Sequence, residues 1–159
     1  MADSDLDALD RRILAELEKD GRLPNSELAQ RVGLSESPCL RRVRRLEQAG
    51  YITGYHAHLE PRLNGRGLTV FVGVKVRRHA SEEVLPFEDW TRGRPEVAAC
   101  FLISGEFDYL LHVAVQDLAA YESFLTGQLL RNPAIADIRS MIAVRSVKAP
   151  FGLAAGALP

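Results

Sequence analysis

The chain has 159 residues, which is enough for one ordinary domain or two small ones. Hydrophobic residues make up 47% and charged residues 26%, a globular balance that excludes a disordered chain, and no apolar run approaches the roughly 20 residues of a membrane span. The net charge of -1 excludes polyanion binding by overall charge, so any affinity for nucleic acid must come from local clusters of arginine.

Two helices are expected first. The range from Asp5 to Lys19 has apolar residues at helical spacing, and Gly21 is expected to end that helix. Asn25 or Ser26 can cap a second, short helix that stops at Gly33. Its inward residues are expected to be Leu28, Ala29 and Val32.

A third helix is predicted between Ser37, as N-cap with Pro38 in the first helical position, and the stop at Gly50. One narrow apolar stripe is expected on it, formed by Leu40, Val43 and Leu46. Four arginines project from its other faces: Arg41, Arg42, Arg44 and Arg45. Such a helix fits a recognition helix in a DNA major groove, although a solvated basic surface helix has the same pattern.

Three short helices with tight connections are typical of a helix-turn-helix, in which the third helix enters the groove by its N-terminal end. Residues 50–55 are expected to form a small extended wing, with Tyr55 as a contact to the DNA backbone. For Cys39 a half-buried position in the helix is the alternative to a DNA contact. The candidate DNA-binding residues are Ser35, Ser37, Pro38, Cys39, Arg41, Arg42, Arg44, Arg45 and Tyr55.

The N-terminal third resembles the Lrp/AsnC family of bacterial regulators over a long, ordered stretch. The matching segments are LDALDRRILAELEKDGR, NSELAQRVGLS and SPCLRRVRRLEQAGYITGY. The resemblance implies a domain that binds double-stranded DNA, joined to a ligand-responsive domain that forms dimers and often higher assemblies, commonly octamers.

After a linker over residues 56–67, the pattern changes to β-branched runs and amphipathic stretches. The predicted order is strand 69–76, helix 81–91, strand 97–103, strand 109–115, helix 117–130 and strand 135–147. Pro86 is expected to shorten or kink its helix, and Gly73 to mark a bulge or a close approach of backbone.

This order predicts an α+β chain with a ferredoxin-like βαββαβ domain, whose antiparallel sheet carries both helices on one face. The uncovered apolar face needs a partner, which argues for a homodimer. The expected organisation is a winged helix-turn-helix domain over 1–55, a linker over 56–67, an effector-binding and oligomerisation domain over 68–148, and a tail over 149–159.

The segment CFLISGEFDYLLHV looks like the effector-loop signature of the same family. A glycine turn exposes backbone amides to a carboxylate, and Asp108 can accept an ammonium group, so the loop suits a free amino acid. The alternative is a loop that only shapes a hairpin. The candidate effector-binding residues are Ser104, Gly105, Glu106, Phe107, Asp108 and Tyr109, with Ile142 from the last strand.

An enzyme is the main competing interpretation, since some sirohaem decarboxylases resemble this two-domain architecture. They have no need for an arginine-rich recognition helix, and the chain carries no serine-nucleophile or phosphate-loop motif. An effector-independent DNA-architectural protein is a second alternative. We expect a transcriptional regulator that responds to a small amino acid, whether leucine-like, otherwise apolar or polar.

Neither cysteines nor histidines form a pattern typical of a metal site or a disulfide framework. Cys39 and Cys100 are far apart, and neither belongs to a CxxC pair. His56 and His58 would share one face of a strand, but surface histidines are the simpler interpretation. The acidic N-terminus lacks an apolar signal core. We therefore expect a cytoplasmic protein without a metal, a cofactor or a membrane partner.

Overall fold

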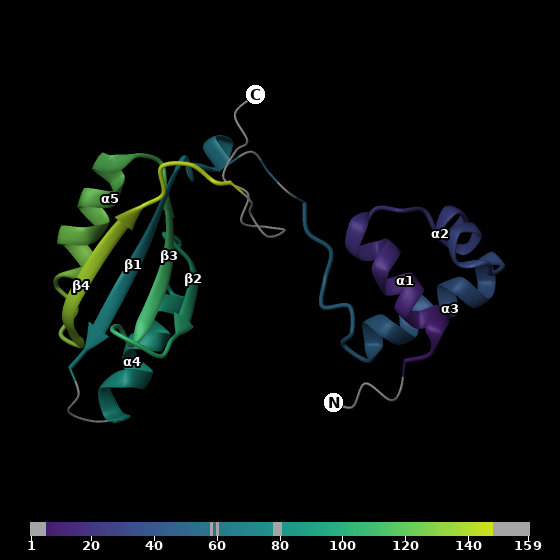
Figure 1. Cartoon of the computed structure of the whole chain (residues 1–159), viewed down its shortest axis with the longest axis horizontal. Helices are drawn as coiled ribbons and strands as arrows, with labels where there is room; N and C mark the ends of the chain where they lie inside the picture. The colour runs from purple at the N-terminus through teal and green to yellow at the C-terminus, as the bar shows by residue number, and fades with distance from the viewer. Residues whose placement is uncertain (1–5, 58, 60, 78–80, 148–159) are drawn as a thin grey trace. The chain divides into compact units, whose positions relative to one another are not determined.

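The computed structural model describes residues 6–57, 59, 61–77 and 81–147 (Figure 1). The chain divides into two compact units, Met1–Ala57 and His58–Pro159. Within the described ranges, no helix is both long and apolar enough to cross a membrane. The predicted tail over 149–159 lies outside the described residues.

The N-terminal unit contains three helices, α1 (Ala8–Lys19), α2 (Asn25–Val32) and α3 (Glu36–Gln48). They enclose one core of buried side chains, formed by Ile13, Leu23, Leu28, Ala29, Val32, Cys39 and Leu46. Gly33 and Gly50 follow α2 and α3 with φ of 77°, the left-handed conformation predicted for helix ends at both positions. The helix-turn-helix expected from the sequence is therefore present.

The helix starts differ from the predicted ones. α1 is capped by Asp7, and α2 follows Pro24, so that Asn25 belongs to the first turn of α2 and donates from Nδ2 to the carbonyl of Glu36 at 3.0 Å. α3 starts two residues earlier than expected, with Ser35 rather than Ser37 in the N-cap position. Pro38 is then the third helical residue, where its missing amide hydrogen still costs no intrahelical bond.

Two smaller expectations in this unit also need correction. α1 ends at Lys19 with Asp20 as its cap, before the predicted stop at Gly21. Residues 51–57 contain no strand, so the expected wing is an irregular segment. Its first residues, Tyr51 and Ile52, are partly buried against the core, and their amides donate to the carbonyl of Leu46 at 2.9 and 3.3 Å.

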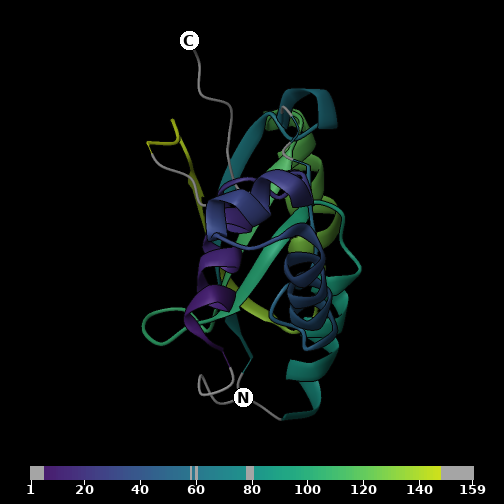
Figure 2. The same cartoon turned by 90° about the vertical axis from the view of Figure 1, so that its right-hand side faces the viewer.

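The C-terminal unit has a four-stranded antiparallel sheet in the order β2-β3-β1-β4. A short 3-10 helix over Pro61–Asn64 precedes it. The other elements are β1 (Leu68–Val76), α4 (Ser81–Arg92), β2 (Val97–Leu102), β3 (Tyr109–Val115), α5 (Leu118–Phe124) and β4 (Ile135–Ile142). Both helices cover one face of the sheet (Figures 1 and 2), which confirms the predicted βαββαβ arrangement.

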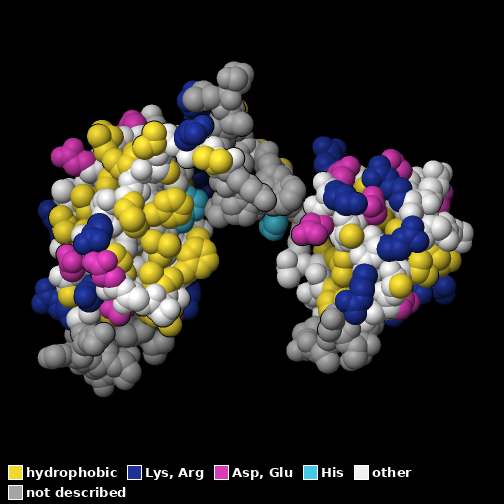
Figure 3. All heavy atoms as spheres, in the orientation of Figure 1, with side chains coloured by type: hydrophobic (Ala, Val, Ile, Leu, Met, Phe, Trp, Pro, Cys, Tyr) yellow, Lys and Arg dark blue, Asp and Glu magenta, His cyan; other side chains and the backbone are white. Residues whose placement is uncertain are grey.

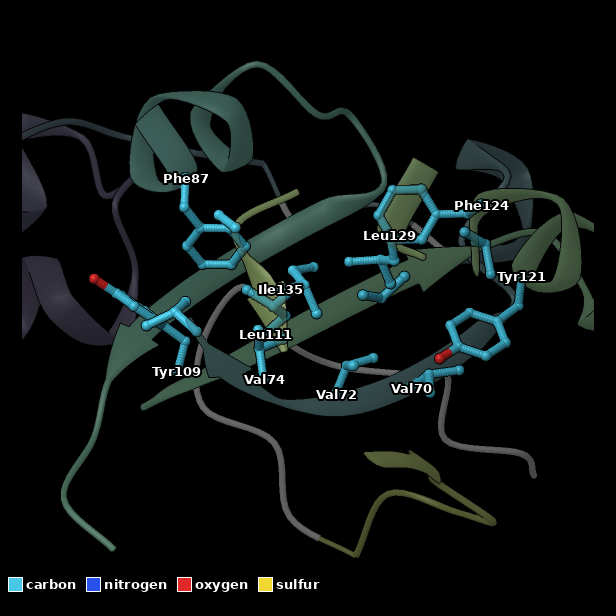
Figure 4. Close-up of a cluster of buried hydrophobic side chains, with 14 residues drawn as sticks. Val70, Val72, Val74, Phe87, Tyr109, Leu111, Tyr121, Phe124, Leu129 and Ile135 are labelled. Atoms are coloured by element: carbon cyan, nitrogen blue, oxygen red, sulfur yellow. The ribbon is translucent and has the colours of Figure 1, made fainter. Parts of the chain in front are cut away.

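The core of this unit lies between that face and the two helices (Figure 4). The alternation of Val70, Val72 and Val74 along β1 points all three side chains into it, where they meet Phe87 of α4 and Phe124 of α5. Figure 4 shows the aromatic rings inserted between strands and helices. Burial of alternate valines is what holds the helices on this face.

Several details of the unit differ from the prediction. α4 runs over Ser81–Arg92 with Pro86 inside it, so Pro86 does not shorten the helix as predicted. α5 passes into a π-helical segment over Leu125–Leu129, where the sequence predicted one continuous helix to residue 130, and Leu118 at its start is exposed. β4 ends at Ile142, five residues before the expected end.

The opposite face of the sheet carries exposed apolar side chains, and Figure 3 shows hydrophobic groups gathered on it. Phe71 lies in register with Met141 on one side and His112 on the other, which places all three on this face. Phe101 of the edge strand is also exposed there, opposite Leu110. A soluble protein seldom leaves such a face in water without a partner.

The ionisation of Tyr109 makes the stability of the C-terminal unit depend on pH in the alkaline range. It is 2% exposed, its hydroxyl donates to Glu88 Oε1 at 2.8 Å, and burial followed by that hydrogen bond raises the pKa of Tyr109 to about 12. The unfolded tyrosine ionises near pH 10. The contribution of Tyr109 to the free energy of unfolding is therefore fully present below pH 10 and falls as the pH rises toward 12.

We expect Tyr109→Phe to remove this loss. Between pH 9 and 12 the free energy of unfolding of the wild type should fall by about 2–3 kcal/mol relative to the variant, which is the value of a shift of about two pKa units. Urea unfolding, followed by the fluorescence of Trp90, measures this free energy. Trp90 is the single tryptophan and belongs to the C-terminal unit, so its signal reports on the unit that contains Tyr109. Parallel pH profiles for the two proteins would contradict the assignment.

Candidate nucleic-acid interface and effector loop

Two arginines of α3 are available to a ligand. Arg41 and Arg44 are exposed, and their side chains take part in no hydrogen bond or ion pair with other described residues. Leu40 shares their face and is 38% exposed, so the predicted apolar stripe is wrong at this position. The stripe that packs on the core instead runs through Cys39, Val43 and Leu46.

The other two arginines are bound to α1. Arg42 Nη1 donates to Asp7 Oδ2 at 2.6 Å and to Asp10 Oδ1 at 2.8 Å, and Arg45 Nη2 donates to Asp10 Oδ2. The carboxylates of Asp10 and Asp7 raise the pKa of Arg42. The pKa of Asp7 is lowered by the backbone amide of Asp10 and then by Arg42. These two guanidinium groups thus have intramolecular partners, which the sequence did not reveal.

Cys39 does not face solvent at all. Its side chain is 0% exposed within the helical core, and burial raises the pKa of its thiol. The core encloses the sulfur, so we drop Cys39 from the DNA contacts and keep the packing role that was its alternative. Ser35 and Ser37 are exposed and Pro38 is half-buried at the N-terminal end of α3, and all three remain predicted DNA contacts.

The side chain of Tyr55 contacts other residues of the N-terminal unit. Its hydroxyl donates to Glu47 Oε1 at 3.0 Å, and its ring lies against Gly21, where an added Cβ would meet Cδ1 at 3.1 Å. Burial, followed by the bond to Glu47, raises the pKa of Tyr55. The ring is still half exposed. In the described structure, Tyr55 anchors the irregular segment to α3 through Glu47.

The loop between β2 and β3 folds onto the open face of the sheet. The ring of Phe107 covers Gly73 so closely that a Cβ at that position would lie 2.6 Å from Phe107 Cδ2. The close approach predicted at Gly73 is therefore present, although the group that approaches is a side chain rather than backbone. Arg139 of β4 stacks over the same ring at 5.4 Å and pairs with Glu106 at 3.0 Å.

Asp108 ties the loop to β1. Its Oδ2 accepts a hydrogen bond from the amide of Val76 at 2.9 Å, and its own amide donates to the carbonyl of Val74 at 3.0 Å. The amide of Ile103 closes the loop on the Asp108 carbonyl at 2.9 Å. Oδ1 has no partner among the described residues, so the carboxylate retains one free oxygen for a cationic group.

The structure brings together only part of the predicted effector set. Ser104, Gly105 and Glu106 are exposed on the loop, but Tyr109 points to the helix-covered face, away from Phe107. Ile142 pairs with Val70, about 10 Å or more along β1 from Gly73, Val74 and Val76, which hold the loop. Within one chain, therefore, neither Tyr109 nor Ile142 lines the same surface as the loop.

Sequence reasoning missed two residues that organise these sites, Asp10 and Arg139, and it did not identify Phe107 as the group that lies against Gly73. Arg139 becomes a candidate only once the strand register is known, because it lies opposite Gly73 on the adjacent strand. In the described ranges, no three His, Cys, Asp or Glu side chains are grouped so that they would hold a metal ion.

Two family models match the chain. The model described as winged helix-turn-helix DNA-binding covers residues 6–53, and the model described as Lrp/AsnC ligand binding domain covers residues 69–153. The leucine-responsive regulatory protein of Escherichia coli (strain K12) is 46% identical over 144 residues, which are 91% of this chain and 88% of that protein. The protein of the same name from Klebsiella pneumoniae has the same identity and coverage.

Solved structures agree with the fold. A transcriptional regulator from Neisseria meningitidis, solved in complex with L-Met, superposes with a TM-score of 0.87 and is 39% identical over 94% of this chain and 96% of that one. An AsnC family transcriptional regulator from Agrobacterium tumefaciens gives a TM-score of 0.86 at 36% identity, with 94% and 97% of the two chains covered.

We expect Gly73→Ala to displace Phe107 and to destabilise the C-terminal unit by about 1–3 kcal/mol, because the added methyl group and the ring cannot occupy the same space. Gly127→Ala is the matched control, since a Cβ there meets nothing within 4 Å. Urea unfolding followed by Trp90 fluorescence compares the two variants. Equal stabilities would show that Phe107 does not rest on Gly73 in solution.

Proposed function

Because the chain belongs to the Lrp/AsnC family of DNA-binding transcriptional regulators, which carry an amino-acid-binding domain, we propose that α3 reads its DNA site and that residues 104–108 sense a small amino acid. The decarboxylase alternative is set aside, since the relatives that match nine-tenths of the chain are transcriptional regulators. Regulation of chromosomal genes would place the protein in the cytoplasm.

The DNA contacts that we propose are centred on the free arginine pair. Arg41 and Arg44 lie three residues apart on one exposed face of α3, and a guanidinium can bind a phosphate or both acceptors of a guanine. Ser35, Ser37 and Pro38 at the start of the helix are the proposed contacts nearest the groove. Arg42, Arg45 and Tyr55 support the helix from within the unit. The observation that carries this assignment is that Arg41 and Arg44 are exposed and have no partner among the described residues.

We propose that the open sheet face binds a second copy of the chain. Phe71, Phe101 and Met141 are exposed there, and a self-complementary contact would remove them from water. Two recognition helices in such a dimer would read half-sites about one helical turn, roughly 34 Å, apart or a multiple of it. Further assembly of dimers, up to an octamer, would allow several half-sites to be bound together.

For the effector we propose an apolar amino acid such as leucine or methionine. The free Oδ1 of Asp108 suits the ammonium group, and amides around Gly105 suit the carboxylate. Ile142, remote from the loop of its own chain, would contribute apolar surface from a neighbouring subunit. The Neisseria meningitidis regulator was solved with L-Met, which supports this choice of class. Unequal binding to two states would then alter DNA affinity or assembly.

We expect the double variant Arg41→Gln/Arg44→Gln to weaken binding to a selected operator duplex by about tenfold or more at fixed salt, since a good bidentate pair is worth roughly 1–3 kcal/mol. Each lost phosphate contact should also reduce the salt slope of log K by about 0.9. Arg131→Gln removes an exposed charge from the other unit and serves as control. Fluorescence anisotropy measures both quantities. If the double variant binds like the control, α3 is not the recognition helix.

A second test separates the charge of Asp108 from its structural bond. Asp108→Asn keeps an oxygen for the amide of Val76 but removes the negative charge, whereas Asp108→Ala removes both. We expect the wild type to gain thermal stability in a screen of twenty amino acids at millimolar concentration, by mass action, and Asp108→Asn to lose that shift. A full shift in Asp108→Asn would refute the ammonium assignment, and the absence of any shift in the wild type would refute the amino-acid class.

A further inference from the structure

We propose that Asp10 is a positioning residue for DNA recognition: its buried carboxylate fixes the rotation of α3 about its own axis and so keeps Arg41 and Arg44 directed at the DNA. The inference rests on the proposed role of α3 and deepens it. Asp10 itself is remote from solvent, with 0% of the residue exposed, and therefore acts through the arginines that it binds.

Both oxygens of the carboxylate are occupied. Oδ1 accepts from Arg42 Nη1 at 2.8 Å, and Oδ2 accepts from Arg45 and from the amide of Asp7, the latter at 3.2 Å. Asp7 in turn accepts from the amide of Asp10 at 2.8 Å, which closes a capping box at the start of α1. The carboxylate is thus fixed to the first turn of α1 before it binds α3.

A buried charge requires a charged partner in good geometry, since leaving it unpaired is strongly unfavourable. Asp10 therefore selects orientations of α3 that bring guanidinium groups to it. Of the two arginines, Arg42 binds both carboxylates, because the nitrogen that binds Asp10 also binds Asp7 at 2.6 Å. Arg45 binds only Asp10 among these acids and keeps 55% of its side chain exposed.

The spacing of the arginines shows how the bond to Asp10 determines which side chains of α3 face outward. Arg42 and Arg45 are three residues apart on one face of α3, and Arg41 and Arg44 repeat the same spacing one residue earlier. One residue corresponds to about 100° of rotation on a helix. A helix turned by that angle to bring Arg41 and Arg44 to Asp10 would place Leu40 and Val43 where Arg41 and Arg44 now face outward. The bond to Asp10 therefore keeps this arginine pair, rather than apolar side chains, on the outward face.

This arrangement affects specific and non-specific binding differently. Non-specific affinity depends on the number of available positive charges, whereas discrimination between sequences depends on the direction of a few side chains at the base edges. Loss of the Asp10 charge would release the guanidinium group of Arg45, leave Arg42 held only by Asp7 and loosen the helix. Discrimination should therefore fall while non-specific binding is kept or strengthened, a combination that simple loss of folding does not produce.

The test compares Asp10→Asn with Glu16→Gln in the full chain. Glu16 lies on the same helix and loses the same charge, but its carboxylate pairs with Lys19 and Arg31 rather than with α3. The probes are the duplex that the wild type selects from a random library and a scrambled duplex of the same composition. Anisotropy titrations over several salt concentrations give the dissociation constants, and circular dichroism checks folding.

We expect Asp10→Asn to reduce the ratio of selected to scrambled affinity by about tenfold or more, with scrambled-duplex binding unchanged or tighter. Glu16→Gln should stay within about twofold of the wild type. An unchanged ratio in Asp10→Asn, or an equal loss on both duplexes, would overturn the proposal. Failure of the proposed function is a distinct result, since a wild type that selects no duplex would then refute the recognition helix itself.

Arg42→Lys keeps the inference testable if Asp10→Asn does not fold. An ammonium retains the charge but cannot reproduce the guanidinium bonds to Asp10 and Asp7, so we expect the same direction of change at a smaller size. A reduced ratio with scrambled binding intact supports the positioning role. A wild-type ratio in a folded Arg42→Lys protein overturns it.

Discussion

A carboxylate buried between two helices is stable only while cations reach it, and the N-terminal unit depends on this constraint at Asp10. The acid lies in the first turn of α1, and the arginines that neutralise it come from α3. A helix whose sequence suggests four equivalent basic residues is thereby divided into a pair that holds the fold and a pair, Arg41 and Arg44, that faces outward. The proposed DNA contacts and the stability of the unit thus depend on different residues of one short helix.

The C-terminal unit shows a comparable division across its sheet. One face is filled by alternate valines of β1 under two helices, while the other carries Phe107 over Gly73 beside exposed apolar groups. Because Phe107 belongs to the loop proposed to bind the effector, a movement of the loop would change the surface proposed to bind a second copy. Sensing and assembly can therefore be linked through one aromatic ring, without a distant relay.

Local patterns were enough to predict the secondary-structure order, the helix ends at Gly33 and Gly50, and the sheet with helices on one face. These features depend on apolar period and on backbone freedom, which neighbouring residues determine. The pairing of Arg42 with an acid 32 residues away, and the complete burial of Cys39, depend on how two helices pack. A single sequence does not specify such side-chain geometry, and the π-helical segment after Phe124 is likewise a tertiary outcome.

Hydrogen–deuterium exchange of the full chain, alone, with its selected duplex and with the amino acid that stabilises it, tests the central claim most directly. The account expects the duplex to slow exchange in α3 (Glu36–Gln48), and the amino acid to slow it in residues 103–109. Protection by the duplex confined to the C-terminal unit, or protection by the amino acid confined to the three helices of the N-terminal unit, would contradict it.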